Sequence, residues 1–435
     1  MKANSQSTER PKERAIVAAI LSANGDGREP ADPLEEIEAL AHAAGAEVVG
    51  GLVQRRRSMH PRTAFGSGKV AELKELAAAS KADIVIIDFD LSPSQGRVLE
   101  KEIGVRIVDR TELILDIFVR RARTKQAKLQ VELAQAEYMR PRLMRMWTHL
   151  ERTEGAIGSR GPGETQLETD RRLIQDRIVD LKRRLSEIDA RRHREATSRE
   201  EPLTVSLVGY TNAGKSSLLA RLTGADVYIA DQLFATLDTR VRQWDLADTR
   251  SVLLADTVGF VRNLPHHLVA SFHATLEETL NADLLLQVVD AADAELEAHL
   301  EAVDDVLGQL GAAEIPRLLV FNKIDRVGPA ERLALSAAYP GSVQVSARGG
   351  EGIDVLDAAV GRWIDEGSLH LELELPAGEG RVLARLHRRA VIDDEKYEGG
   401  QWSARVRILP RHWNGMRAEF EDRGGVCRAR IGVAD

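Results

Sequence analysis

The stretch that decides the fold is "LTVSLVGYTNAGKSSLLARL", residues 203–222. An apolar run leads into the pattern G-x-x-x-x-G-K-[ST], formed by Gly209, Gly214, Lys215 and Ser216, and a helical pattern follows. Glycines allow several backbone N–H groups to converge on one anion, and the helix N-terminus adds its dipole. In such a loop the lysine neutralises the β- and γ-phosphates and the hydroxyl binds Mg²⁺. The order strand, loop, helix therefore predicts a P-loop domain that binds a nucleoside triphosphate.

A second Gly-Lys pair lies in "TAFGSGKVAEL", residues 63–73. Thr63 stands where the first glycine of a phosphate loop should be, and Val70 stands where a hydroxyl is required. This stretch therefore predicts a glycine turn that opens a helix.

The base is read further along the chain. "LLVFNKID" places Asn322, Lys323 and Asp325 directly after an apolar run. A carboxylate there can accept hydrogen bonds from N1–H and the exocyclic amine of guanine, and adenine offers no such pair. "VSAR", residues 345–348, ends the next strand, where the Ala347 N–H could meet guanine O6. The order of these motifs predicts that the nucleotide is GTP or GDP.

The stretch "LLADTVGFVRN", residues 253–263, has the form of a turn that senses a γ-phosphate. Asp256 follows an apolar strand, as the aspartate that helps hold Mg²⁺ does in P-loop enzymes, and Gly259 is the turn glycine. "DQLFATLDTRVR", residues 231–242, precedes that strand and offers Thr236 as the switch threonine, with Thr239 as a competitor.

These motifs define the predicted site. We expect Mg²⁺ to be held by Ser216, Thr236 and Asp256, and hydrolysis to depend on Lys215, Asn212, Thr236 and Gly259. The residues predicted to contact the nucleotide are Gly209, Tyr210, Thr211, Asn212, Ala213, Gly214, Lys215, Ser216, Ser217, Phe234, Ala235, Thr236, Asp256, Thr257, Val258, Gly259, Asn322, Lys323, Asp325, Ser346, Ala347 and Arg348.

Apolar runs alternate with helical patterns on both sides of one long helical stretch, which indicates parallel α/β sheets. We predict one helix from Thr111 to about Arg140, which Pro141 breaks or bends, and a second from about Gln166 to His193, with a glycine-rich loop between them. The fold class is α/β, and the predicted parts are a disordered N-terminus (1–12), an N-terminal parallel α/β domain (13–110), a long antiparallel helical arm (111–194, loop 153–164), a linker (195–202), a central P-loop GTPase (G) domain (203–366) and a small C-terminal α+β domain (367–435).

Composition limits the setting. The 435 residues contain one cysteine, so a disulfide framework within the chain is excluded, and no apolar run is long enough to cross a membrane. We expect a cytoplasmic monomer without a stable membrane anchor. The net charge of −8 argues against a generally basic, DNA-coating protein. Basic clusters outside the central domain nevertheless favour RNA binding; they are residues 54–62, 120–128, 139–145 and 181–185.

Several longer motifs resemble the HflX family, in the Obg–HflX group of translation-factor-related GTPases. They include "GSGKVAEL", "KLQVELAQAEYMRPRL", "GSRGPGETQLETDRR", "GYTNAGKSS", "DQLFATLD", "DTVGFVRNLPHHLVASFHATLEE" and "NKID", and together they span residues 66–325. One departure is "FATLDTRVR", where many relatives read Leu-Asp-Pro-Thr. It leaves Thr236 in place but blurs which residues after Asp238 belong to the switch.

The resemblance implies a ribosome-associated GTPase that binds the large ribosomal subunit, including its rRNA, and acts on stalled or stressed ribosomes. It also implies that the N-terminal domain and the arm make these contacts, with the loop at 153–164 near the peptidyl-transferase region. Arg152 and Arg160 would then be available to phosphates, and the alternative is that this loop is a plain connector of two helices.

The hydrolytic mechanism is the open question at Phe260. Many GTPases place a glutamine at this position to orient the attacking water, and a phenyl ring can neither accept a proton nor hold water. Asn212 offers a substitute, because an asparagine there resembles K⁺-activated GTPases, in which it helps to hold a monovalent cation near the phosphates. The alternative is that Asn212 only shapes the loop. We expect slow basal hydrolysis that ribosomes stimulate.

Three other functions remain to be weighed. The chain could be a GTP-dependent switch that binds RNA or ribosomes with negligible hydrolysis. It could be a GTPase with another client, in tRNA modification or membrane signalling. An ATP-driven RNA remodeller in the N-terminal region would need a second phosphate loop, which the sequence lacks.

Overall fold

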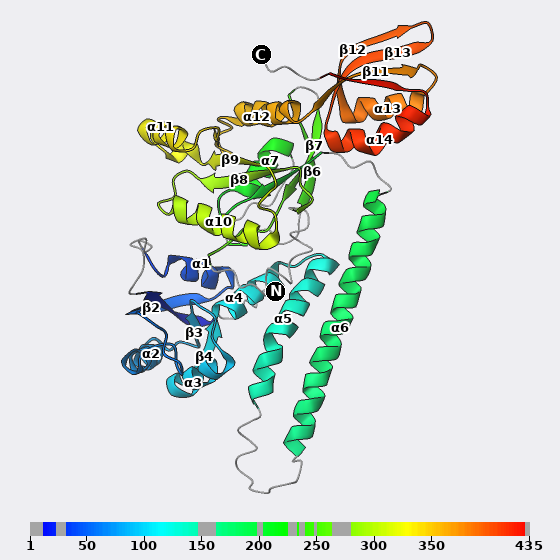
Figure 1. Cartoon of the computed structure of the whole chain (residues 1–435). Helices are drawn as coiled ribbons and strands as arrows, with labels where there is room; N and C mark the ends of the chain where they lie inside the picture. Colours follow the sequence, from blue (N-terminus) through cyan, green and yellow to red (C-terminus); the bar gives the residue numbers. More distant parts are fainter. Residues whose placement is uncertain are drawn as a thin grey trace, which may run out of the picture.

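The computed structural model describes residues 12–22, 32–146, 162–197, 203–224, 233–234, 240–247, 250–262 and 280–430. Figure 1 shows the G domain between the N-terminal and C-terminal domains, with two long helices extending to one side. The predicted α/β fold class is confirmed, since the N-terminal and central domains are built on parallel sheets.

The N-terminal domain is a four-stranded parallel sheet in the order β2-β1-β3-β4. Its elements are β1 (Arg14–Ser22), α1 (Glu35–Ala43), β2 (Glu47–Arg56), α2 (Ser67–Ser80), β3 (Ile84–Ile87), α3 (Pro93–Ile103) and β4 (Arg106–Asp109). Alternate residues of a strand face opposite sides of the sheet. Accordingly Ile86 packs in the core that contains Leu40 of α1, and Val85 packs in the core that contains Leu73 of α2. The interpretation of "GSGK" as a helix start is confirmed, because α2 begins at Ser67.

The arm differs from its prediction at two points. The expected single helix is two helices, α4 (Arg110–Arg121) and α5 (Lys125–Met146). The chain becomes extended at Ala122, and the Thr124 hydroxyl accepts a hydrogen bond from the Ala127 N–H at 3.1 Å, so that it caps the new helix. The prediction missed this cap signal inside an otherwise continuous helical pattern.

Of the two outcomes predicted at Pro141, a break or a bend, the break does not occur, because α5 continues through this residue to Met146. Contacts with the N-terminal domain hold this turn. The Tyr138 hydroxyl donates to Asp109 at 2.8 Å, and Arg142 pairs with Asp109 while donating to the Leu91 carbonyl at 3.0 Å. Tertiary contacts therefore outweigh the local cost of a helical proline.

The second arm helix, α6 (Pro162–Thr197), is longer than predicted and lies antiparallel beside α5 (Figure 1). An apolar seam joins the two helices; it consists of Leu129, Leu133, Ile178, Leu181 and Leu185. Ion pairs flank the seam, such as Lys182 with Glu137 at 2.8 Å. The predicted loop tip, with Arg152 and Arg160, lies outside the described residues.

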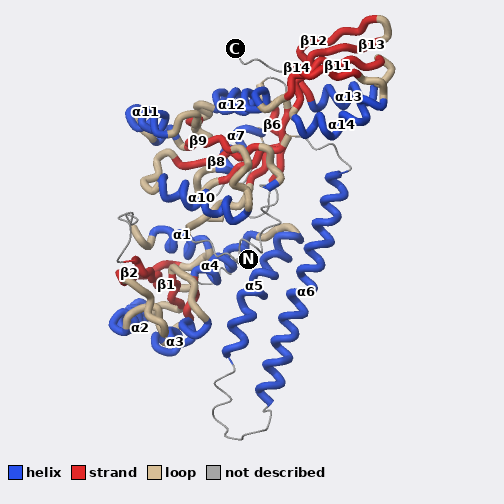
Figure 2. Tube along the Cα trace, viewed as in Figure 1, coloured by secondary structure: helices blue, strands red, loops and turns tan. Residues whose placement is uncertain are grey.

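The G domain has a six-stranded sheet in the order β10-β9-β8-β5-β7-β6, which Figure 2 shows with helices on either side. Its elements are β5 (Thr204–Val208), α7 (Lys215–Thr223), β6 (Arg240–Asp245), β7 (Ser251–Asp256), β8 (Leu284–Asp290), α10 (Leu296–Leu310), β9 (Arg317–Asn322), η1 (Ile324–Arg326), α11 (Pro329–Ala338), β10 (Val343–Gln344) and α12 (Ile353–Glu366). All neighbouring strands are parallel except β6, which is antiparallel to β7. The prediction missed β6 and assigned its first residues to the switch, since only Trp244 of this edge strand is buried.

The C-terminal domain is a four-stranded antiparallel sheet in the order β12-β13-β11-β14. Its elements are β11 (Leu369–Pro376), α13 (Gly380–Arg389), β12 (Ala390–Glu398), β13 (Gln401–Ile408), α14 (Pro410–Asp422) and β14 (Val426–Arg430). Trp402 and Phe420 fill the core between the sheet and its helices. Within the part of the chain that the structure describes, no helix has the length and apolar character needed to cross a membrane.

Candidate nucleotide-binding site

The phosphate loop lies between β5 and α7, at the carboxyl ends of the central strands. Its two motif glycines both have positive φ, +147° at Gly209 and +93° at Gly214. A Cβ on Gly209 would collide with the Val288 carbonyl oxygen, and one on Gly214 would collide with the Asn322 amide. The glycines are therefore required both for backbone conformation and for close packing against neighbouring strands.

Lys215 is buried in this loop. Its Nζ donates to the carbonyl oxygens of Gly209 at 2.9 Å and Tyr210 at 2.7 Å. Burial lowers the pKa of Lys215 to about 8, although the nearby carboxylate of Asp256 favours the charged form. A bound phosphate would place negative charge beside the ammonium group and so favour its charged form.

Two of the three predicted metal ligands meet at the start of α7. Ser216 Oγ donates to Asp256 Oδ2 at 2.6 Å, and Asp256 is fully buried at the end of β7. A hydroxyl and a carboxylate are the hard oxygen donors that Mg²⁺ prefers, so this pair fits the ion. The third predicted ligand, Thr236, and its neighbour Ala235 lie outside the described residues, as does the competitor Thr239.

The base-recognition motifs converge on the same edge of the sheet. Asn322 donates to the Ala213 carbonyl at 2.9 Å and accepts from the Ala347 N–H at 3.0 Å, so it joins the phosphate loop to the "VSAR" loop. Asp325 is exposed, and it accepts a hydrogen bond from Ser346 Oγ at 2.6 Å. This hydrogen bond lowers the pKa of Asp325, which keeps it a carboxylate that can accept from guanine.

Other predicted contact residues have structural partners of their own. Lys323 has a left-handed backbone (φ +61°) and pairs with Asp290 at 2.8 Å. Thr257 Oγ1 donates to the Leu207 carbonyl at 2.7 Å. Asn212 is exposed on the loop, also with a left-handed backbone (φ +63°). Their predicted roles toward a nucleotide remain predictions.

Sequence reasoning missed Arg221 on α7. Its guanidinium donates to the carbonyl oxygens of Ala347 at 2.9 Å and Arg348 at 2.6 Å, and it thereby fastens the loop expected to meet guanine O6. Nothing in the local pattern singled it out, because an arginine in a helix is ordinarily a solvated residue.

The switch turn lies directly against the phosphate loop. The Phe260 N–H donates to the Gly209 carbonyl at 3.1 Å, and the Thr211 N–H donates to the Phe260 carbonyl at 2.7 Å. A Cβ built on Gly259 would lie 3.1 Å from Lys215 Nζ and 3.0 Å from Thr211 Cα. The turn predicted to sense the γ-phosphate is thus adjacent to the lysine predicted to neutralise it.

The Phe260 side chain is 1% exposed and belongs to a core shared by two domains. This core combines Val258, Phe260 and Val261 of the switch turn with residues of α1 and α4. Phe234, from the predicted switch stretch, packs edge-on against Phe118 of α4 with ring centroids 4.8 Å apart. The phenyl ring at position 260 therefore serves the contact with the N-terminal domain.

A buried polar network accompanies this contact. Glu36 of α1 accepts hydrogen bonds from the Tyr210 hydroxyl and from Arg262 Nε, the latter at 2.9 Å, and pairs with Arg110. Arg110 also pairs with Asp88 and donates to the Arg262 carbonyl at 2.8 Å. Burial would raise the pKa of Glu36, but the charge of Arg110 and the other donors hold it below its ordinary value. Through Glu36 and Arg110, the N-terminal domain is thus hydrogen-bonded to both the phosphate loop and the switch turn.

Replacing Arg110 by alanine should destabilise this contact by about 3–5 kcal/mol, because the largely buried Asp88 would lose its ion-pair partner and Glu36 would keep only Arg262 as a charged partner. Hydrogen exchange followed by mass spectrometry should show lost protection in α1 and at residues 209–211. Arg62→Ala is the matched control, since Arg62 pairs with Glu102 at an exposed position and should contribute little. Equal protection in the Arg110 variant and wild type would contradict the prediction.

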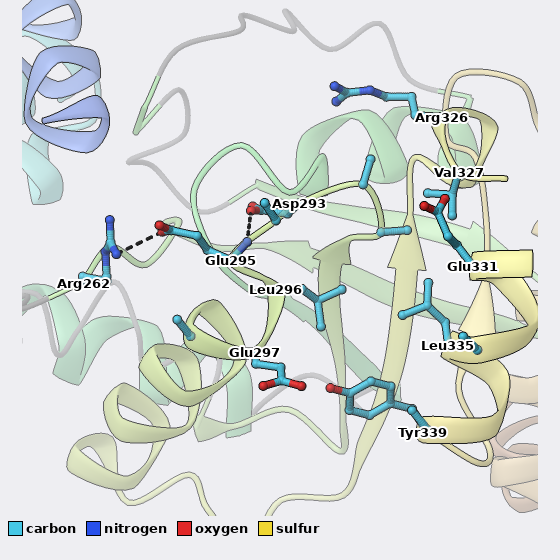
Figure 3. Close-up of a pocket in the computed structure, with 16 residues that line it drawn as sticks. Arg262, Asp293, Glu295, Leu296, Glu297, Arg326, Val327, Glu331, Leu335 and Tyr339 are labelled. Carbon is cyan, nitrogen blue, oxygen red and sulfur yellow. Dashed lines mark hydrogen bonds and ion pairs between the residues drawn. The ribbon is translucent and has the colours of Figure 1, made fainter. Parts of the chain in front are cut away.

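A groove of about 780 Å³ lies beside the predicted nucleotide site, between α10 and α11. Figure 3 shows Arg262 paired with Glu295 at one end of it, with Leu335 and Tyr339 at the other. None of the residues predicted to contact the nucleotide lines the groove. It is therefore a separate feature of the G domain.

Family comparisons agree with this architecture domain by domain. Residues 31–119 match a model described as GTP-binding GTPase N-terminal, residues 121–199 a GTP-binding GTPase middle region, and residues 204–323 a 50S ribosome-binding GTPase. Among solved structures, a GTP-binding protein from Sulfolobus solfataricus in complex with GDP covers 80% of this chain and 97% of its own, with a TM-score of 0.41 and 24% identity.

Curated relatives settle the family. GTPase HflX of Escherichia coli (strain K12) is 48% identical over 387 residues, which cover 88% of this chain and 91% of the relative. GTPase HflX of Magnetococcus marinus is 44% identical over 395 residues, which cover 90% and 91%. A phosphate loop, a guanine-reading carboxylate and a switch turn at one sheet edge are what GTP hydrolysis requires. This chain is a GTP-hydrolysing enzyme and belongs to the HflX family of GTPases.

Proposed function

We propose that this GTPase binds the large ribosomal subunit, including its rRNA, and uses GTP hydrolysis to split or rescue stalled or stressed ribosomes. The observation that carries the proposal is the match of residues 204–323 to a family model described as a 50S ribosome-binding GTPase. Close relatives at 44–48% identity span nearly the whole chain, so the N-terminal domain and arm belong to the same functional unit.

The shape of the molecule supports a large partner. In Figure 1 the α5–α6 pair forms a long arm, in which α5 runs beside the N-terminal domain and contacts it through Tyr138 and Arg142, and α6 lies on the outer side of α5. An extended helical pair of this kind can reach into a cleft of a large assembly while the G domain stays at the surface. The arm and the N-terminal domain are the parts that we assign to ribosome contact.

Two of the basic clusters present exposed side chains that could meet rRNA. Arg55, Arg57 and Arg62 of the N-terminal domain are exposed, and such side chains can neutralise backbone phosphates. In the cluster at 181–185 the exposed side chains of Lys182, Arg183 and Arg184 each form an ion pair within the arm, as Arg62 does with Glu102 in the first cluster. The first cluster supports RNA contact by the N-terminal domain; on α6, Lys182 pairs with Glu137 of α5, and Arg183 and Arg184 pair within α6 itself.

The metal site follows from the geometry of Ser216 and Asp256. These two residues, with Thr236, would hold Mg²⁺, and the ion would neutralise charge on the β- and γ-phosphates. Among the described residues, no group of three or more histidine, cysteine or carboxylate side chains could hold a metal ion independently of the nucleotide. Dependence on Mg²⁺ should therefore appear only together with nucleotide.

A monovalent cation is the proposed second activator. Asn212 is exposed at the loop with a left-handed backbone, so its amide is free to face a bound nucleotide and a cation beside it. We expect GTP turnover to be severalfold faster in KCl than in NaCl at equal ionic strength, and we expect Asn212→Ala to remove this difference. Phosphate release measured in both salts checks this, and equal wild-type rates in the two salts would contradict it.

Sedimentation tests the ribosome proposal. The full-length chain is centrifuged with purified large subunits, small subunits or whole ribosomes, in the presence of a non-hydrolysable GTP analogue or GDP. We expect co-sedimentation with large subunits in the analogue, weaker binding in GDP, and dissociation of whole ribosomes into subunits.

The outcomes separate the competing functions. Failure to bind any ribosomal particle while GTP hydrolysis persists would favour a non-ribosomal client, such as an enzyme of tRNA modification or a membrane-signalling protein. Binding to large subunits without dissociation of whole ribosomes would support a ribosome-associated role but reject splitting. A substitution of the exposed arginines, Arg55, Arg57 and Arg62 to alanine together, should weaken binding and reduce its salt dependence.

A further inference from the structure

Thr211, the third residue of the phosphate loop, has a hydroxyl with no evident purpose. The residue is 6% exposed, and Oγ1 has no hydrogen-bond partner among the residues that the structure describes. Its neighbours differ, since Ser216 Oγ donates to Asp256 and Thr257 Oγ1 donates to the Leu207 carbonyl. A buried hydroxyl without a partner costs free energy, and such a group in a native protein calls for an explanation.

Thr211 lies beside the groups that are expected to meet the γ-phosphate. Thr211 Cγ2 lies 2.8 Å and Lys215 Nζ lies 3.1 Å from the place that a Cβ on Gly259 would occupy. Thr211, Lys215 and Gly259 are therefore packed against one another. The lysine of a phosphate loop contacts the β- and γ-phosphates, so a bound γ-phosphate and its attacking water would lie next to these residues. Ser206 also has a buried hydroxyl without a described partner, but it lies on β5 within the sheet.

The switch turn of this chain lacks a side chain that could orient the attacking water. Hydrolysis of GTP requires a water molecule aligned with the bond that breaks, and many GTPases use the residue after the switch glycine to orient it. In this chain that residue is Phe260, whose side chain is buried in the core shared with the N-terminal domain. The backbone N–H and carbonyl of Phe260 both form hydrogen bonds with the phosphate loop, so neither the side chain nor the backbone of residue 260 is placed to orient the water.

We propose that the Thr211 hydroxyl positions the attacking water in GTP hydrolysis. Oγ1 accepts a hydrogen bond from the water and donates its own proton in a hydrogen bond to a γ-phosphate oxygen, which a hydroxyl can do simultaneously. The water oxygen bonds to the γ-phosphorus, and the bond to the β–γ bridging oxygen breaks with its electron pair leaving on GDP. The proton of the water passes to the phosphate product, and Thr211 ends the step unchanged.

Paired substitutions isolate the hydroxyl. Thr211→Val keeps the shape of the side chain and removes the hydroxyl, whereas Thr211→Ser keeps the hydroxyl and removes the methyl group. In single-turnover hydrolysis by the full-length chain with saturating Mg²⁺ and KCl, we expect the rate constant of the valine variant to fall about 10- to 100-fold. The serine variant should stay within about threefold of wild type, and the affinity of all three proteins for GDP should agree within about twofold.

A matched control uses the same substitution elsewhere in the domain. Thr223 lies at the end of α7, where its hydroxyl donates to the Leu219 carbonyl at 2.8 Å. Thr223→Val should leave the hydrolysis rate unchanged.

Three results would overturn the proposal. The first is wild-type hydrolysis by Thr211→Val, both alone and with large ribosomal subunits. The second is an equal loss in the serine variant, which would assign the effect to packing of the methyl group against Gly259. The third is a loss of GDP affinity parallel to the loss of rate, which would assign Thr211 a structural role in the loop.

Discussion

Replacing Asp325 by asparagine is expected to lower the affinity for GDP by about 10³-fold and to create affinity for xanthosine diphosphate. The carboxylate accepts from N1–H and the 2-amino group of guanine, and an amide nitrogen cannot accept. Xanthine carries a carbonyl oxygen at position 2, to which the amide nitrogen can donate. Ser346 Oγ, 2.6 Å from Asp325 Oδ1, can still donate to the amide oxygen and so turn the nitrogen toward the base.

Fluorescent nucleotide titration checks this exchange of specificity. The matched control is Asp305→Asn, which makes the same change on the exposed surface of α10 in the same domain and should alter neither affinity. Loss of both nucleotides would mean that the substitution damages the site. Unchanged GDP affinity would mean that Asp325 does not read the base.

The predictable part of the site is the part written in contiguous motifs. Phosphate loops and guanine-reading carboxylates need particular residues at fixed spacing, because backbone amides and a base edge impose short-range geometry. The structure brings Lys215, Ser216, Asp256 and Asp325 to one edge of the central sheet, as the order of motifs indicated. Parallel strands explain this, since their carboxyl ends meet at one edge whatever the distance along the chain.

The contacts between domains could not be predicted in this way. Glu36 is 174 residues from Tyr210 and 226 residues from Arg262, and nothing near it in the sequence distinguishes it from the other acidic residues of α1. The local sequence also could not decide whether Pro141 breaks the helix or leaves it continuous, because tertiary contacts settle that choice. There the hydrogen bond of Tyr138 and the ion pair of Arg142 with Asp109 outweigh the tendency of proline to end a helix.

Phe260 belongs both to a contiguous sequence motif and to the contact between domains. In the sequence, Phe260 occupies the position at which many GTPases have a glutamine. In the fold, its side chain is buried in a core that contains residues of both the switch turn and the N-terminal domain. Phe260 directly follows Gly259, and its ring is buried in a core that also contains residues of α1 and α4. A change in the backbone at Gly259 would therefore be expected to disturb the packing of this core against α1 and α4. The polar network around Arg110 lies beside the same core, because Arg110 donates to the Arg262 carbonyl and pairs with Glu36.

Lys215→Ala should reduce kcat/KM for GTP about 10³-fold, because the ammonium is the positive charge that the phosphate loop itself supplies to the reacting phosphates. Phosphate release under multiple-turnover conditions measures the loss. Turnover at the wild-type rate would show that the assigned loop is not the site of hydrolysis.

The same lysine predicts how nucleotide binding depends on pH. Its pKa is about 8 while it is buried against loop carbonyls, and bound phosphates favour the charged form, so the complex holds the proton to higher pH than the empty protein does. Nucleotide affinity should therefore be constant below pH 7.5 and fall by up to about tenfold between pH 8 and 9. In Lys215→Ala the affinity should be lower throughout but should lack this slope, so the variant also controls for titration of the nucleotide. Equal slopes in the two proteins would assign the pH dependence to a group other than Lys215.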